Sequence, residues 1–108
     1  MPNVSTTDLA SARAAGATQL IDVREPSEYV SGHVPGAVSI PMAQLVDRLD
    51  EIDSSRPVFV VCQAGGRSSA MTDLLLHRGF DARSVDGGTA AWIAAGHPVI
   101  TGTTPEGK

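Results

Sequence analysis

The chain has 108 residues, a length that suits one compact domain over residues 1–108 and leaves little room for a second. Apolar residues make up 42% and charged residues 19%, which is the balance of a globular protein rather than a disordered one. The formal net charge of -4 argues against a broad basic surface, so we expect neither nucleic acid nor an anionic membrane as a partner.

The sequence also bears on the compartment. No apolar run approaches the roughly 20 residues that a membrane-spanning helix needs, and the polar residues 1–8 lack the pattern of a signal peptide. The only cysteine, Cys62, cannot form an internal disulfide bond, which agrees with a reducing environment. We therefore expect a cytoplasmic location.

In chain order, the first half of the sequence predicts short elements of both kinds. Ser5 and Asp8 have the spacing of a helix-capping pair, and Gly16 would end the helix that follows them. The other elements expected here are a buried strand over 19–23, a brief helix over 26–30, a strand over 38–40 and an amphipathic helix over 42–49.

The second half contains the strongest strand. Residues 58–62 (Val-Phe-Val-Val-Cys) are apolar on both faces, as expected at the centre of a parallel sheet covered by helices on both sides. The last residues, 101–108, are expected to form a flexible tail. The remaining expected elements are a helix around 70–75, a strand over 82–85, a helix over 89–95 and an edge strand beginning at 99–100.

This alternation predicts an α/β domain with three layers, a mostly parallel central sheet with helices on both faces. Ligands bind such sheets at the carboxyl ends of the strands. Cys62 ends the strongest strand, so it lies where we expect chemistry.

The segment after that strand has the composition of an anion-binding loop. Two glycines permit a tight turn with inward N–H groups, and the helix that follows adds the positive end of its dipole. An arginine adds a fixed positive charge that can grip an oxyanion. Comparable surroundings lower the pKa of a cysteine to about 3.5–7.5, which favours the nucleophilic thiolate. The residues are Cys62, Gln63, Ala64, Gly65, Gly66, Arg67 and Ser68.

A less specific interpretation competes with this one. Free cysteine is among the most buried residue types, so Cys62 alone would be interpreted as an inert strand residue. The glycines and Arg67 that follow at this spacing favour the reactive interpretation. An arginine is electrostatically unfavourable in the first turn of a helix, which supports a ligand-binding role for Arg67 over a plain surface position.

Four motifs stand in order within residues 9–100. They are Leu20-Ile21-Asp22-Val23-Arg24-Glu25, then Glu28-Tyr29 with Gly32-His33-Val34-Pro35-Gly36-Ala37, then Cys62-x-x-Gly65-x-Arg67-Ser68, and finally Gly79-Phe80 with Asp86-Gly87-Gly88 and Trp92. One of these motifs alone would be weak evidence, but all four together are highly specific, and they resemble the signatures of the rhodanese-like family.

The resemblance implies a rhodanese-like domain with sulfurtransferase activity. The Cys62 thiolate would take sulfane sulfur from thiosulfate or a similar donor as a persulfide, and cyanide or a cellular thiol would accept it. Loop amides from Gln63 to Ser68 would hold the persulfide, and Arg67 would help to hold an anionic donor. No metal and no organic cofactor is implied. We expect a monomer whose partners are small-molecule donors and acceptors, or a protein that donates or accepts a persulfide.

Two alternatives stay open. The chain could be a persulfide carrier that a partner protein loads, because donor choice depends on pocket walls and partner surfaces. It could also be a cysteine-based phosphatase or arsenate reductase of the same fold. Those related enzymes have five residues between Cys and Arg, whereas four residues, 63–66, separate Cys62 from Arg67 here. The shorter loop favours the smaller sulfur species.

Four further residues are expected to support the site. Asp22 and Arg24 lie at the end of the first strand, where we expect them to pair with loop groups rather than contact substrate. His33, in a Gly-His-Val-Pro-Gly turn, is expected to make a structural hydrogen bond rather than act as a base. Trp92 is expected to pack its helix against the sheet rather than border the pocket.

Overall fold

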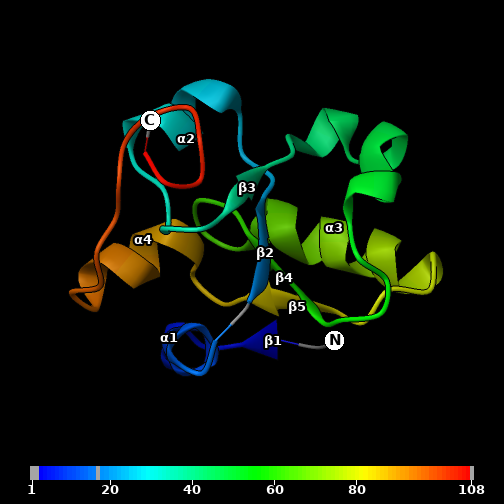
Figure 1. The fold of residues 1–108 in the computed structure, drawn as a ribbon, viewed down its shortest axis with the longest axis horizontal. Coiled ribbons are helices and arrows are strands. Elements are labelled where there is room, and N and C mark those ends of the chain that lie inside the picture. Colours follow the sequence, from blue (N-terminus) through cyan, green and yellow to red (C-terminus); the bar gives the residue numbers. More distant parts are fainter. Residues whose placement is uncertain (1–2, 17, 108) are drawn as a thin grey trace.

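The computed structural model describes residues 3–16 and 18–107, and Figure 1 shows its strands and helices. The strands are β1 (Asn3–Val4), β2 (Gln19–Asp22), β3 (Val38–Ser39), β4 (Val58–Val61) and β5 (Ala82–Val85). The α-helices are α1 (Thr6–Ala14), α2 (Pro26–Ser31), α3 (Gly66–His77) and α4 (Gly88–Ala94). Two 3-10 segments are η1 (Met42–Gln44) and η2 (Val46–Glu51).

The strands form one sheet in the order β1-β5-β4-β2-β3, and each of these neighbouring pairs is parallel. β4 is central, and all four of its residues are buried. Asp22 pairs with Val61, so β2 and β4 end side by side. The expected α/β fold with a parallel central sheet is confirmed, and the residue after β4, Cys62, lies at the carboxyl edge of that sheet.

Side chains along β4 alternate between two hydrophobic clusters, one on each face of the sheet. Val60 belongs to the cluster that contains Leu75 of α3. Val61 belongs to the cluster that contains Leu9 of α1 and Trp92 of α4. Helices therefore cover both faces (Figure 1). Burial of each large apolar side chain contributes roughly 1.5–3 kcal/mol to the free energy of unfolding, so the central strand is held from both sides.

The edge of the sheet differs from the expectation. A strand beginning at 99–100 is wrong, because Ile100 forms only an isolated antiparallel bridge with His33. One edge of the sheet is instead formed by β1, where Val4 pairs with Val85. A strand of two residues is too short to show an alternating pattern. Its position comes from the free edge of β5 rather than from its own sequence.

The segment expected as an amphipathic α-helix over 42–49 forms η1 and η2 instead. Arg48, with φ −121° and ψ 21°, interrupts the helical backbone. Leu45 is buried, but Val46 is 48% exposed. A 3-10 helix has three residues per turn, so side chains spaced for an α-helix cannot all face the core.

Two further predictions concern residues near the two ends of the chain. The capping pair of α1 forms, because the Asp8 N–H donates to Ser5 Oγ at 3.0 Å and the Ser5 N–H donates to Asp8 Oδ2 at 3.1 Å. Residues 101–107 lie along the body of the domain, where the Gly102 N–H donates to the Val30 carbonyl and the Gly36 N–H donates to the Pro105 carbonyl. The flexibility of this tail stays a prediction.

Among the described residues, no helix has the length and apolar character needed to cross a membrane.

Candidate active site

Cys62 stands at the end of β4 with its side chain turned into the loop that follows. Its Sγ accepts a hydrogen bond from the Gly65 N–H at 3.0 Å and lies 3.4 Å from Ser68 Oγ. Gly65 has φ 114°, a left-handed conformation that favours glycine, and α3 begins at the next residue, Gly66. This turn brings the first amides of α3 back over the sulfur.

Burial and hydrogen bonding act on the Cys62 thiol in opposite directions. Burial, the largest influence, raises its pKa. The side chain and N–H of Ser68, with the amides of Gly65 and Ala64, favour the thiolate and together outweigh burial, so the pKa lies below its usual value. The hydrogen bonds of the loop thus stabilise a negative charge on the sulfur.

A second buried hydroxyl supports Ser68 from beneath the loop. Ser68 Oγ lies 2.9 Å from Ser84 Oγ of β5 and donates to the Gly65 carbonyl at 3.1 Å. When Cys62 is ionised, the Ser68 hydroxyl can turn to donate to the sulfur while Ser84 donates to Ser68. Sequence reasoning missed Ser84. The only signal was a hydroxyl within a strand that is otherwise expected to be buried.

The start of α4 holds the backbone of the loop. The N–H and hydroxyl of Thr89 donate to the Cys62 carbonyl at 2.8 and 3.0 Å, and the Ala90 N–H donates to the Gln63 carbonyl at 3.0 Å. Gly88 has φ 59°, and a Cβ at this position would lie 2.4 Å from the Cys62 carbonyl oxygen. The glycine therefore permits the close approach. The sequence indicated only a tight turn here, and Thr89 was missed.

Asp22 and Arg24 form a buried ion pair beside the loop. The Arg24 Nε and Nη2 donate to the Asp22 carboxylate at 3.0 and 2.9 Å. Arg24 also donates to Gln63 Oε1 at 3.0 Å and to the Gly32 carbonyl at 2.7 Å. The pair thus joins the ends of β2 and α2 to the loop after Cys62. This placement suits the expected supporting role, which stays a prediction.

Arg67 forms a second ion pair, with Glu28 of α2. Its Nη1 and Nη2 donate to the two carboxylate oxygens at 2.7 and 2.9 Å. The two side chains are 33% and 31% exposed. Hydrogen bonds from Arg67 lower the pKa of Glu28 to about 2, so the carboxylate stays charged. Sequence reasoning included Glu28 only within a motif, because nothing local links it to an arginine so far along the chain.

His33 and Trp92 lie in the interior. The His33 Nδ1–H donates to the Tyr29 carbonyl at 2.9 Å, and the two rings stack with centroids 3.8 Å apart. Its Nε2 has no hydrogen-bond partner among the described residues. Trp92 is 1% exposed and its Nε1–H donates to the Pro98 carbonyl at 2.7 Å, so it contributes to the core.

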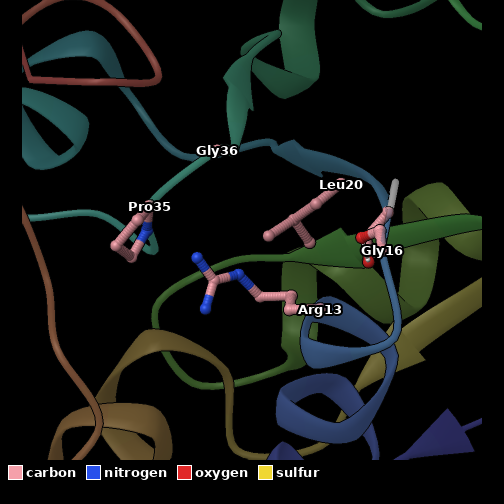
Figure 2. A pocket seen from close by; sticks show the side chains of 6 residues that line it. Arg13, Gly16, Leu20, Pro35 and Gly36 are labelled. Atoms are coloured by element: carbon pink, nitrogen blue, oxygen red, sulfur yellow. Dashed lines mark hydrogen bonds between the residues drawn. The ribbon is translucent and has the colours of Figure 1, made fainter.

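A hollow of about 170 Å³ lies elsewhere, beside the start of β2. Figure 2 shows the Arg13 side chain extending into it, toward Pro35. Gly36 and Leu20 also line it. Because Leu20 precedes the end of β2 and Cys62 follows the end of β4, the hollow is at the amino end of the parallel sheet. Ligands of such sheets bind at the opposite end, so this hollow is not part of the candidate site.

Comparisons with known proteins agree with this geometry. The family model described as a rhodanese-like domain matches residues 5–95. The chain is 36% identical over 101 residues to "HTH-type transcriptional regulator Rv0324" of Mycobacterium tuberculosis, covering 92% of this chain and 45% of that protein. It thus spans less than half the length of this curated relative.

Two solved structures show the same fold. The rhodanese-like domain of Alr3790 from Anabaena sp. is 32% identical, with 95% of this chain and 81% of that chain covered and a TM-score of 0.85. A thiosulfate sulfurtransferase from Pseudomonas aeruginosa is 25% identical, with 94% and 20% covered and a TM-score of 0.85. With its fold, its loop and the family match in agreement, this chain belongs to the rhodanese-like domain family.

Proposed function

We propose that this chain is a sulfurtransferase that carries sulfane sulfur as a persulfide on Cys62. The observation that carries the proposal is the hydrogen bonding of the Cys62 sulfur. Cys62 Sγ accepts the Gly65 N–H at 3.0 Å, and its pKa is lowered by hydrogen bonds that outweigh burial. A thiolate held by amides is a nucleophile, and the same amides suit the anionic persulfide that it would become. The solved thiosulfate sulfurtransferase with this fold supports the class of reaction.

The reaction needs two displacements at sulfur. In the first, the Cys62 thiolate attacks the outer sulfur of thiosulfate, a new S–S bond forms, and the old S–S bond breaks as sulfite leaves with its electron pair. In the second, cyanide or a thiolate attacks the outer sulfur of the persulfide and the Cys62 thiolate leaves. The charges balance in both steps, and neither step needs an external oxidant.

A persulfide carrier loaded by a partner protein is the second candidate. The ion pair between Arg67 and Glu28 favours it, because the arginine expected to bind an anionic donor already has a carboxylate partner. For both candidates we propose a cytoplasmic monomer that uses small-molecule or protein-bound sulfur and needs no metal or organic cofactor. Neither candidate involves nucleic acid or a membrane. The four residues between Cys62 and Arg67 make a phosphatase or arsenate reductase the weaker alternative.

Intact-protein mass spectrometry after incubation with excess thiosulfate tests the proposal. We expect the wild type to gain one sulfur atom and Cys62→Ser to gain none. A second incubation uses the persulfide of 2-mercaptoethanol as donor. Sulfur gained only from the second donor would support the carrier. Sulfur gained from neither would contradict the proposed function, and Cys62-dependent hydrolysis of para-nitrophenyl phosphate would then favour a phosphatase.

A further inference from the structure

The ion pair between Glu28 and Arg67 is bidentate. The two Nη atoms of Arg67 bind the two carboxylate oxygens of Glu28, at 2.7 and 2.9 Å. The arginine still has its Nε–H and its outer Nη–H bonds, because a guanidinium carries five N–H donors. Arg67 can therefore still donate hydrogen bonds to a ligand, although its positive charge is compensated.

Glu28 is also held from its own helix. Its Oε1 accepts the Glu25 N–H at 3.1 Å, within a reciprocal cap at the start of α2. The carboxylate thus has three hydrogen bonds from two different segments of the chain. A carboxylate fixed in this way is not a mobile surface group that moves aside freely when an anion arrives.

The formal charges of the two ion pairs that flank the loop cancel within each pair, so they do not offset the charge of the Cys62 thiolate. Arg24 is paired with Asp22, and Arg67 is paired with Glu28. Each pair is neutral as a whole, which leaves the charge of the Cys62 thiolate. A donor with two negative charges, such as thiosulfate, would approach this site against electrostatic repulsion, whereas a donor with an organic group on the inner sulfur would meet little repulsion.

We propose that Glu28 is a specificity-determining residue, which by compensating the charge of Arg67 directs Cys62 toward organic persulfides and away from dianionic sulfur donors. The inference rests on the proposed function, since it assigns the donor class of the same site. In the loading step, the Cys62 thiolate attacks the outer sulfur of R–S–SH. A new S–S bond forms, the old one breaks, the proton stays on the transferred sulfur, and R–S⁻ leaves with the electron pair.

The first experiment measures a ratio of loading rates. Sulfur gain on Cys62 is followed by mass spectrometry with thiosulfate and with the persulfide of 2-mercaptoethanol, in wild type, Glu28→Gln and Glu51→Gln. Glu51 is the matched control, because it makes a bidentate pair with Arg48, at 2.7 and 2.8 Å, on η2 rather than beside the loop. Glutamine keeps the size of Glu28 and its capacity to accept the Glu25 N–H.

We expect Glu28→Gln to raise the thiosulfate-to-persulfide rate ratio by about tenfold at low ionic strength, and Glu51→Gln to leave the ratio unchanged. An unchanged or lower ratio in Glu28→Gln would overturn the inference, because Glu28 would then serve only to position Arg67. The ratio also separates this effect from a general change in thiolate reactivity, which would alter both rates alike.

The second experiment does not depend on sulfur transfer. Iodoacetate and iodoacetamide alkylate a thiolate by the same reaction but differ by one negative charge. We expect Glu28→Gln to raise the iodoacetate-to-iodoacetamide rate ratio at Cys62 by about threefold, with no change in Glu51→Gln. An unchanged ratio would overturn the electrostatic role of Glu28. If Cys62 takes sulfur from neither donor, the proposed function fails, while this ratio still reports on Glu28.

Discussion

Two ion pairs flank the loop after Cys62, and they have similar contact distances but different surroundings. Arg24 and Asp22 lie 2.9 Å apart and are 3% and 0% exposed. Arg67 and Glu28 lie 2.7 Å apart, and about a third of each side chain is exposed. By contact distance alone, the Arg67–Glu28 pair would be ranked as the stronger one. Breaking the Arg24–Asp22 pair should nevertheless cost more folding stability, because an unpaired charge costs far more in the interior than beside water.

The two arginines also differ in what they contact. Arg24 joins Asp22, Gln63 and the Gly32 carbonyl, so it ties three segments together beneath the loop. Arg67 contacts Glu28 at the accessible side of the same loop. The Arg24–Asp22 pair is buried from solvent, whereas about a third of each side chain of the Arg67–Glu28 pair is exposed. An anionic ligand can therefore reach the second pair, and the compensated charge of Arg67 is the basis of the proposed selection among sulfur donors.

Replacing Asp22 with alanine should have the largest effect on stability. The substitution leaves the Arg24 guanidinium buried without its counter-charge, which costs about 3–5 kcal/mol. Urea unfolding of the variant and the wild type measures the difference. Asp81→Ala is the matched control, since Asp81 and Arg83 have the same spacing and a 3.1 Å contact but are 57% and 39% exposed. A loss of under about 1 kcal/mol in Asp22→Ala would show that burial does not distinguish the two ion pairs.

Replacing Arg67 with alanine should affect stability much less and function more. We expect the free energy of unfolding to change by about 0–1 kcal/mol, as for other exposed pairs. Sulfur loading of Cys62 from thiosulfate should fall by about tenfold, because the hydrogen-bonding guanidinium of Arg67 is lost and the charge of Glu28 is left uncompensated. Urea unfolding and mass spectrometry measure the two effects. An unfolded variant would instead make Arg67 a structural residue.

The smallest expected effect is the loss of stability at acid pH when Glu28 becomes protonated. The pKa of Glu28 is about 2 in the folded chain, against an ordinary value of 4.5. The stabilisation from its contact with Arg67 is therefore present above pH 4.5 and is lost as the pH falls toward 2. We expect wild type to exceed Glu28→Gln in stability by under about 1 kcal/mol near neutral pH, and the difference to disappear near pH 2. A difference that does not change with pH would exclude the ion pair as its cause.

Much of the fold was predictable because its signals are local. The capping pair Ser5 and Asp8, the apolar strand over 58–62 and the glycines after it each act within a few residues. The edge strand β1 and the 3-10 form of residues 42–51 were not predictable in this way. Their structure depends on a neighbouring strand and on packing, which no short pattern records.

The candidate site divides along the same line. Cys62, Gly65 and Ser68 are near neighbours in the chain, so their convergence could be inferred from a strand, a turn and a helix start. Glu28 and Ser84 reach the loop from α2 and β5. A glutamate in a helix cap and a serine in a strand have many ordinary explanations, so neither pointed to the loop.

By itself the sequence determined the candidate nucleophile and the turn that presents it, because a strand, two glycines and a helix start place Cys62 and its amides within one short segment. Only the tertiary structure decided which charges surround the sulfur. The sheet order sets β2 and β5 on either side of β4, and the packing of α2 brings Glu28 to Arg67. Electrostatic interactions depend on distance in space and on burial, and neither can be inferred from how far apart two residues are along the chain.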